Sequence, residues 1–514
     1  MEKFGFKNFK RFKNFPIISL SPITLLVGPN NSGKSSFIKA LTFLYFNLAH
    51  QQKTTKVCPP FINNVSFSQN TASNFDWGDF TTTLHRESIG DDISFMWEMR
   101  GVRFAFSFGA SLDEITLNPS LKATLPIISL DIESEKYGII IANTKKGQVW
   151  ETNVKISLEK FLEWVKLSMD WFKGRMERSS YNVLKKNPIL RNLEAWDGSM
   201  NHRFNERLEI RYADYAKVLG MPTEDQNGYF EFSYSSPLDT PLKKALHDYC
   251  DYCVNLISGN RLGKALIAPD FEYIEAHNAP HTNAISADDK NSFLARTVTE
   301  FNSDVPFMPE NYEIYAWVNK WMKEFKIGDF FQIDTHFGGE ILTVGIGKES
   351  ESWEYTHGGK SLIPLASLGT GGIQLFILLL KIADVLKRIG EYGFVTIIIE
   401  EPEQNLHPAL QSKLADLFLE VYKMTDARVK FLVETHSEYL IRRTQVIVAK
   451  ESYVDEKDLE AKNPFKVYYF PEEGLPYDMR YLPSGRFENK FGEGFFDESA
   501  KWHMEIIRKE KSRK

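Results

Sequence analysis

The sequence predicts an α/β protein: a mixed, mostly parallel sheet covered by helices, joined to an antiparallel subsheet and interrupted by an inserted, mainly helical domain. Three patterns predict this fold class. From residue 330 onward, strand-type and helix-type segments alternate, as they do in a parallel sheet with crossover helices. Residues 93–149 contain short runs of β-type composition, which favour an antiparallel sheet. Residues 155–325 are mainly helical by their apolar period, so they predict the inserted domain.

Length and composition indicate a large folded protein. The chain has 514 residues, more than one domain usually holds, so we expect a core domain that carries an insertion or appendage. Hydrophobic residues make up 43% and charged residues 25%, and the 39 Phe and 21 Tyr argue against extensive disorder. The formal net charge of −6 excludes a globally basic nucleic-acid binder.

Cysteine usage and hydropathy predict a cytoplasmic location. Three cysteines give no disulfide framework and are typical of a reducing compartment. The N-terminal residues have no unbroken apolar stretch of signal-peptide length. The most apolar later run, residues 375–380, is far shorter than the roughly 20 residues that cross a bilayer.

The N-terminal part is expected to hold two strands, a helix and the antiparallel sheet. Residues 4–27 alternate short apolar runs with turn residues, which predicts two strands. Residues 34–49 place apolar side chains on one helical face. The four β-type runs of the antiparallel sheet are residues 93–99, 102–108, 127–132 and 137–143.

The C-terminal part is expected to supply the parallel sheet and its helices. The predicted strands and helices, in chain order, are strands 330–335 and 341–346, a helix over 371–388, a strand over 395–399, a helix over 407–423, a strand over 431–433 and a helix from Ser437.

A phosphate-binding loop lies between the first strands and the first helix. The segment GPNNSGKSS fits the eight-residue P-loop pattern, and the required strand and helix flank it. Its backbone N–H groups and the helix N-terminus are expected to surround the β-phosphate. Lys34 should reach the β- and γ-phosphates, and the Ser35 hydroxyl should hold Mg²⁺. The nucleotide-binding residues predicted here are Gly28, Pro29, Asn30, Asn31, Ser32, Gly33, Lys34, Ser35 and Ser36.

Two acids end the predicted strand 395–399. This run is continuously apolar or β-branched, as in a strand buried inside a parallel sheet, and Glu400 and Glu401 follow it. Adjacent acids without a nearby base repel one another unless a cation is present, so the pair favours a metal site. We assign Glu400 as the metal-side acid and Glu401 as the general base.

Four ordered motifs give a resemblance to a known family. The segments EEPEQNLHP (400–408) and FLVETHSEYLI (431–441) resemble the Walker B, D-loop and H-loop segments of ABC-type ATPases, in the branch containing RecF, Rad50 and the OLD proteins. The segment SLGTGGIQ (367–374) is similar to the signature loop of that family. The resemblance covers about residues 1–110 and 330–445, and Glu400 stands where the family usually has Asp.

The resemblance implies a nucleotide site shared between two chains. ATP, with Mg²⁺, would lie between one P-loop and the signature loop of the other chain, so a single head should be a poor ATPase. Thr370, Gly371 and Gly372 would then contact the γ-phosphate in trans, at a helix N-terminus whose dipole favours an anion. His436 would contact the γ-phosphate and the attacking water. The glutamine that often contacts Mg²⁺ is not assigned; Gln69 and residues 75–86 lie in the matching region.

The resemblance also divides the chain into domains. The expected parts are the N-terminal half of the ATPase head at 1–150, the inserted helical domain at 151–328, the C-terminal half of the head at 329–450 and a C-terminal extension at 451–514. Only some 70 residues follow the H-loop, too few for the TOPRIM nuclease domain of OLD proteins, so we expect a stand-alone ATPase. Glu472, Glu473 and Asp478 offer similar chemistry, but Gly474 and Pro476 predict a hairpin turn there.

Two other side-chain groups are interpreted as packing rather than as sites. His247, Cys250 and Cys253 share one predicted helix, near the imidazoles of residues 277–281, but a single straight helix cannot supply four tetrahedral zinc ligands. The aromatic side chains at 161, 164, 171 and 172 are interpreted as core rather than as a base-stacking surface.

These inferences lead to one functional hypothesis and two alternatives. The leading hypothesis is a homodimeric ATPase, or a higher assembly of dimers, that controls a separate effector, expected to be a nuclease, in bacterial anti-phage defence, as in systems such as Septu or PARIS. The first alternative is a RecF-like repair or chromosome-associated clamp that binds duplex DNA, with contacts from Lys7, Lys10, Arg11 and Lys13. A transporter subunit is disfavoured because no segment is suited to coupling with a membrane protein.

Overall fold

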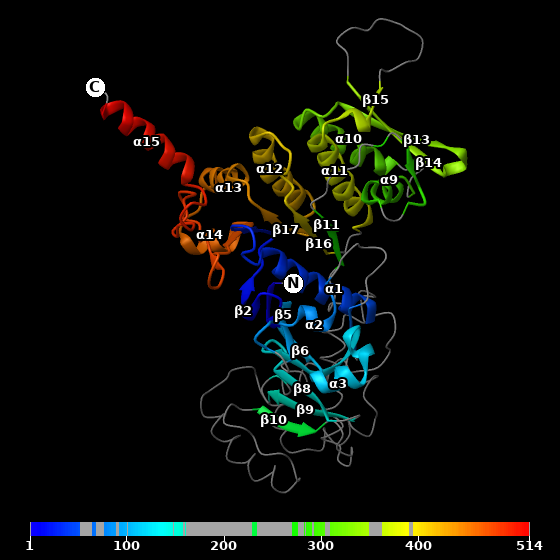
Figure 1. Ribbon diagram of the computed structural model, residues 1–514, viewed down its shortest axis with the longest axis vertical. Helices are drawn as coiled ribbons and strands as arrows, with labels where there is room; N and C mark the ends of the chain where they lie inside the picture. The colour runs from blue at the N-terminus through cyan, green and yellow to red at the C-terminus, as the bar shows by residue number, and fades with distance from the viewer. Residues whose placement is uncertain are drawn as a thin grey trace, which may run out of the picture. The chain divides into compact units, whose positions relative to one another are not determined.

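The protein is described by a computed structural model. It describes residues 2–51, 64–67, 77–88, 92–99, 101–146, 149–157, 160, 229–233, 270–275, 282, 284–289, 292–303, 309–348, 362–389 and 394–512. These belong to two compact units (Figure 1): Met1–Ser19, Thr42–Ser68 and Gly78–Ala268 form the first, and Leu20–Leu41, Gln69–Trp77 and Pro269–Lys514 form the second. Most of the predicted insertion lies outside the described residues, as do Gln69, His247, Cys250, Cys253, residues 277–281 and the aromatic residues at 161–172.

In the part of the chain that the structure describes, the first unit is built on one antiparallel sheet of nine strands. The strand order is β10 (Tyr229–Ser233), β9 (Val149–Ser157), β8 (Ile139–Lys146), β7 (Thr124–Ser134), β6 (Val102–Phe108), β5 (Ile93–Met99), β1 (Lys3–Phe9) and β2 (Phe12–Ser19), and β4 (Asn64–Ser66) pairs with β7. The four β-type runs predicted from the sequence are β5 to β8, and every pairing among them is antiparallel. The short helices α2 (Phe80–Thr83) and α3 (Leu112–Leu117) and the 3₁₀ turn η1 (Pro119–Lys122) also belong to this unit.

Phenylalanine dominates the core of the first unit. The rings of Phe6 and Phe15 stack with their centroids 4.6 Å apart, and those of Phe43 and Phe95 stack at 5.8 Å. Buried side chains alternate with partly exposed ones along β5 and β6, because successive side chains of a strand point to opposite faces of the sheet.

The prediction of two strands over residues 4–27 was wrong, because the structure has three. Lys10, at φ 51°, lies in the turn between β1 and β2. The second strand includes Pro16, which has no N–H to donate. A sheet tolerates proline in this strand because β2 lies at the edge of the sheet, where one side of the strand has no partner strand.

The second unit contains the predicted parallel sheet. Its strand order is β11 (Asp270–Ile274), β16 (Val395–Glu400), β17 (Val429–Thr435), β3 (Ile23–Val27), β18 (Phe465–Tyr469) and β19 (Tyr477–Asp478). The first five strands are parallel, and β18 and β19 form an antiparallel hairpin, as Gly474 and Pro476 predicted. All five residues of β3 are buried. Since parallel strands end at one edge, the residues that follow β3, β16 and β17 lie at the same edge of the sheet.

Helices and a small second sheet complete this unit. The helices are α1 (Lys34–Gln51), which continues into the first unit from Thr42, α9 (Phe293–Ser303), α10 (Pro309–Glu324), α11 (Thr370–Arg388), α12 (Pro408–Met424), α13 (Glu438–Lys450), α14 (Glu456–Lys462) and α15 (Glu498–Ser512). The small sheet comprises β12 (Ile285–Ser286), β13 (Phe330–His336), β14 (Ile341–Gly347) and β15 (Leu362–Pro364), with the 3₁₀ turns η2 (Phe337–Gly339) and η3 (Leu365–Ser367). Both α9 and α10 pack against α11, and α12 packs against α13 (Figure 1). Within the described ranges, no helix combines the length and the apolar character needed to cross a membrane.

Candidate functional site

The loop after β3 has the backbone of a tight phosphate cradle. Gly28, Asn31 and Gly33 have φ values of 153°, 59° and 102°. A Cβ atom on Gly28 would lie only 2.2 Å from the carbonyl oxygen of Phe470, so no other residue fits at this position. The hydroxyl of Ser32 is buried and has no hydrogen-bond partner among the described residues. The loop at the start of α1 therefore combines a tight backbone with a buried hydroxyl whose hydrogen-bonding capacity is unused among the described residues.

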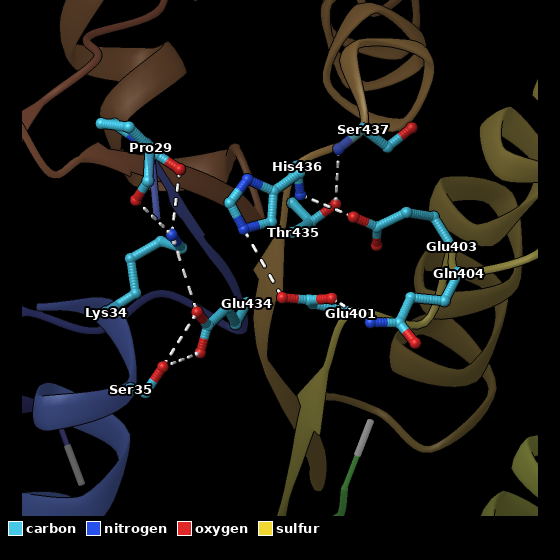
Figure 2. Close-up of polar contacts among 11 residues, drawn as sticks. Pro29, Lys34, Ser35, Glu401, Glu403, Gln404, Glu434, Thr435, His436 and Ser437 are labelled. Carbon is cyan, nitrogen blue, oxygen red and sulfur yellow. Dashed lines mark hydrogen bonds and ion pairs between the residues drawn. The ribbon is translucent and has the colours of Figure 1, made fainter. Parts of the chain in front are cut away.

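The Lys34 ammonium group and the Ser35 hydroxyl converge on one carboxylate, that of Glu434. Lys34 Nζ donates to the carbonyl oxygens of Gly28 and Pro29, each at 2.9 Å, and lies 3.7 Å from Glu434 Oε1. Ser35 Oγ lies 3.2 Å from both carboxylate oxygens of Glu434 (Figure 2). Burial lowers the pKa of Lys34, and the negative charge of Glu434 opposes this shift.

Glu434 is not among the site residues predicted from the sequence. It is the penultimate residue of β17, the strand between β16 and β3, and it is 4% exposed. Burial raises its pKa to about 7; Lys34 and the Ser35 hydroxyl oppose the rise, and the charges of Glu400 and Glu401 add to it. A signal was present, since an acid ends a strongly apolar strand, but the position of that strand beside β3 cannot be read from residue order.

Glu400 lies one strand farther from the loop. It is the register partner of Glu434 on β16, and its carboxylate accepts a hydrogen bond from Tyr273 of β11. Burial raises the pKa of Glu400, and the charge of Glu275 adds to this rise. Glu400 also lines a small cavity with Glu275 and Gln374. Its predicted role as the metal-side acid stays a prediction, and the hydroxyl of Ser35 is hydrogen-bonded to Glu434 instead.

Glu401 and His436 lie together, as their predicted roles require. His436 Nε2 is 3.5 Å from Glu401 Oε1, and the other oxygen of Glu401 accepts a hydrogen bond from Gln404 Nε2 (Figure 2). Glu401 has φ 44°, and its N–H donates to the carbonyl oxygen of Glu434 at 2.8 Å. Burial and the nearby Lys34 charge lower the pKa of His436, so its neutral imidazole is favoured. A neutral imidazole leaves the Glu401 carboxylate free to accept a proton.

Glu403 holds the segment that carries His436. Its side chain is buried, and Oε1 accepts the backbone N–H of His436 at 2.6 Å (Figure 2). Ser437 begins α13 as its N-cap, and its hydroxyl donates to Gln411 Oε1 at 2.6 Å. The ends of β16 and β17 are thus joined by hydrogen bonds as well as by the sheet.

The signature segment begins α11 and packs on the same loop. Gly369 is its N-cap, and the helix starts at Thr370. A Cβ atom on Gly371 would lie 2.4 Å from the carbonyl oxygen of Asn405, and Asn405 Nδ2 donates to Gln374 Oε1 at 3.2 Å. The structure therefore places Gly371 against Asn405 of its own chain. The proposed contacts of Thr370, Gly371 and Gly372 with a second chain's nucleotide stay predictions.

The assembled groups are suited to a polyphosphate with a divalent cation. Ligand atoms of Glu401, Glu434 and His436 lie within 4.8 Å of one another. Carboxylate and hydroxyl oxygens are the ligands that Mg²⁺ prefers, and the Ser35 hydroxyl adds one. The unpartnered Ser32 hydroxyl, the glycine-lined loop and the Lys34 ammonium group match the needs of phosphate oxygens.

Comparisons with known proteins bear on this arrangement. Residues 23–442 match the family model described as "AAA domain, putative AbiEii toxin, Type IV TA system". A search of curated proteins gave no match. Similar solved structures include an Smc head bound to the C-winged helix domain of ScpA, at 14% identity and TM-score 0.30, covering 93% of this chain and 97% of that chain. The SMC head domain from Thermotoga maritima is 11% identical with TM-score 0.31, covering 93% and 98%. A Pyrococcus furiosus complex, an Smc head with an extended coiled coil bound to the C-terminal domain of ScpA, is 12% identical with TM-score 0.30, covering 99% of each chain.

Proposed function

The chain belongs to the family described as AAA domain, putative AbiEii toxin, Type IV TA system, and on this premise we propose that it binds and hydrolyses ATP as one head of a dimer. The predicted α/β fold is confirmed by the parallel and antiparallel sheets and their helices, and the match to an AAA domain family supports the predicted relationship to ATPases. The observation that carries the proposal is the convergence of five side chains at one sheet edge, those of Lys34, Ser35, Glu401, Glu434 and His436. They belong to the start of α1 and to the ends of β16 and β17, so the helix start is more than 360 residues away from the two strand ends.

The P-loop residues bind the phosphates. The loop N–H groups and the N-terminus of α1 surround the β-phosphate, and Lys34 exchanges the carbonyl oxygens of Gly28 and Pro29 for phosphate oxygens. The Ser35 hydroxyl would hold Mg²⁺, and the ion would offset charge that builds up on the phosphates. This exchange of partners needs no large movement, because Lys34 already lies over the loop.

Glu401 acts on the attacking water. Its carboxylate accepts the water proton, and Gln404 fixes the orientation of that carboxylate by donating to its other oxygen. His436, 3.5 Å from Glu401, stays neutral and contacts the water and the γ-phosphate. A base held between two partners is positioned before the substrate arrives, which lowers the entropic cost of reaching the transition state.

The second half of the site comes from a second copy. Helix α11 begins at Thr370, and its N-cap Gly369 is exposed and has no side chain that could cap the helix. Such a helix start favours an anion, and we propose that it receives the γ-phosphate bound to the P-loop of the other chain. A lone head would bind ATP but hydrolyse it slowly.

The finer biological role rests on the resemblance to stand-alone ATPases of defence systems. We propose that opening and closing of the dimer controls a separate effector, a nuclease, in anti-phage defence in the cytoplasm of bacteria. The alternative is a RecF-like clamp on duplex DNA. One observation favours this alternative: Lys7, Arg11 and Lys13 are exposed on the hairpin of β1 and β2, and Lys10 of the same hairpin donates to the carbonyl oxygen of Thr82.

The substitution Glu401→Gln tests the enzymatic proposal. It removes the proton acceptor but keeps the size of the side chain, so turnover should fall roughly 10²- to 10⁴-fold while ATP binding persists and the dimer accumulates. The measurements are phosphate release and light scattering with ATP and Mg²⁺. Glu473→Gln, in the exposed turn after β18, is the control and should match the wild type. Unchanged turnover in the Glu401 variant would remove this residue from the base role.

A further inference from the structure

The geometry points to Glu434 as a direct carboxylate ligand of the divalent cation held by Ser35. This inference rests on the proposed ATPase function and deepens it. The inference gives Glu434 the metal-binding role that was predicted from the sequence for Glu400.

Sheet topology puts Glu434 nearer to the loop than Glu400. Strand β17 lies between β16 and β3, so the end of β16 is two strands away from the P-loop strand and the end of β17 is one. Neighbouring strands are about 4.8 Å apart. Glu434 pairs in register with Leu26 on one side and with Glu400 on the other, so the two acids end neighbouring strands at the same level.

The distances suit two ligands of one cation. Ser35 Oγ lies 3.2 Å from each carboxylate oxygen of Glu434. Mg²⁺ binds oxygen at 2.0–2.1 Å in an octahedron, which places adjacent ligands about 3 Å apart. A cation can therefore replace the hydroxyl hydrogen bond between these oxygens with only a small shift of either side chain.

A second observation points to a ligand beside this pair. The Ser32 hydroxyl is 2% exposed, has no hydrogen-bond partner in the described part of the chain and lies 3.0 Å from the Cβ position of Gly28, inside the loop. A buried hydroxyl without a partner costs free energy, which phosphate oxygens bound in the loop would recover. The carboxylate of Glu434, which contacts Ser35 and Lys34, thus lies next to a loop whose unused hydroxyl is suited to a phosphate oxygen.

The placement of Glu434 gives the cation a second effect. Without the cation, the carboxylate lies 3.7 Å from Lys34 Nζ and presents negative charge to incoming phosphates. With the cation between Ser35 and Glu434, that charge is offset and Lys34 is released to the phosphates. Nucleotide affinity should therefore be much higher with the divalent cation than without it, because the Glu434 charge repels the phosphates when no cation is bound.

Nucleotide and metal binding by Glu434→Gln test the inference. ADP affinity is measured calorimetrically with Mg²⁺ and with EDTA, and Mn²⁺ affinity of the ADP-bound protein is measured by electron paramagnetic resonance. The variant should bind Mn²⁺ at least about tenfold more weakly. It should bind ADP more tightly than the wild type in EDTA, because the repulsive charge is gone. Glu473→Gln, in the exposed turn after β18, is the control and should keep the wild-type cation dependence.

The outcomes separate this inference from the proposed function. If the wild type binds no adenine nucleotide, the proposed function fails. If the wild type binds Mg²⁺ and ADP together and Glu434→Gln does the same, the function stands and the inference is overturned. Glu434→Asp is the second variant, for use if the Gln variant does not fold. This variant keeps the negative charge but shortens the side chain by one methylene. It should therefore weaken Mn²⁺ binding and leave ADP affinity in EDTA unchanged. Wild-type Mn²⁺ affinity in this variant would also overturn the inference.

Discussion

Gly28 links a single backbone position to ligand binding. Its φ of 153° and the nearby carbonyl oxygen of Phe470 leave no room for a side chain. The loop conformation that aims N–H groups at phosphate is therefore fixed by the absence of a Cβ atom. Gly101, in the turn between β5 and β6, also has a positive φ of 74°, but nothing lies within 4 Å of its Cβ position.

We expect Gly28→Ala to abolish nucleotide binding and to destabilise the fold. The added methyl group would have to displace backbone, which costs about 2 to 4 kcal/mol. Urea unfolding and ADP titration measure the two effects. Gly101→Ala is the matched control, because it introduces backbone strain of about 1 kcal/mol without a steric clash. Equal losses in both variants would contradict the role assigned to the Phe470 contact.

Glu434 should make the stability of the metal-free protein depend on pH. Its pKa is raised from 4.5 to about 7 in the fold, so the protonated form stabilises the folded state. This contribution is fully present below pH 4.5 and is lost as the pH rises through about 7. Above that pH, a charged carboxylate stays buried beside Glu400 and Glu401.

Glu434→Gln should therefore gain stability relative to the wild type as pH rises. Between about pH 5 and about pH 8 the relative gain should reach up to about 3 kcal/mol, since one pKa unit corresponds to about 1.4 kcal/mol. Urea unfolding in EDTA at both pH values measures it, with Glu473→Gln as the exposed control. A difference between variant and wild type that does not change with pH would show that Glu434 does not titrate in this range.

At the scale of elements, the loop from Glu401 to Leu406 joins three functional segments. Through Glu401 it carries the proposed base, through Glu403 it holds the N–H of His436, and through Asn405 it contacts the start of α11. The contact of Glu403 reaches a backbone N–H, and the backbone of Asn405 lies against Gly371. A shift of this loop would therefore move the base, the His436 segment and the signature helix together.

Glu403 offers a test of this coupling. Glu403→Ala leaves the N–H of His436 without its buried acceptor, which costs about 1 to 3 kcal/mol. We expect turnover to fall at least about tenfold with little change in ATP affinity, because the base and the phosphate loop are retained. Glu403→Gln keeps an acceptor oxygen and should restore most of the turnover. A Gln variant as impaired as the Ala variant would contradict a role through this hydrogen bond.

The difference between prediction and structure lies mainly in the spatial order of elements. Local sequence patterns predicted the P-loop, the acids at the end of β16 and the main helices, because the spacing of apolar residues and the capping residues reflect structure within a few positions. They could not show that β17 lies between β16 and β3, because strand order depends on packing between distant segments. For this reason Glu400, and not Glu434, was the metal-side acid predicted from the sequence. The extra strand at residues 12–19 was missed because a proline in an edge strand resembles a turn signal.

At the scale of the whole molecule, the proposed dimer requires that two incomplete sites complete each other. Lys34→Ala disables the P-loop of its own chain. Gly369→Glu places a negative charge at the start of α11, where no atom of the described residues lies within 4 Å of the Cβ position. The chain should therefore fold normally and repel a γ-phosphate from outside. Each variant alone should have little activity, because both sites of its homodimer carry the defect.

An equimolar mixture of the Lys34→Ala and Gly369→Glu variants should regain ATPase activity. Half of randomly formed dimers contain one chain of each kind, and in these one of the two sites pairs an intact P-loop with an intact signature segment. Recovery should therefore approach ~25% of wild-type turnover for a symmetric dimer with independent sites. Phosphate release measured against protein concentration follows this recovery, and Gly369→Ala, which adds only a methyl group in open space, should retain activity as the control. A mixture no more active than its components would mean that each chain completes its own site, and the role of α11 in trans would have to be abandoned.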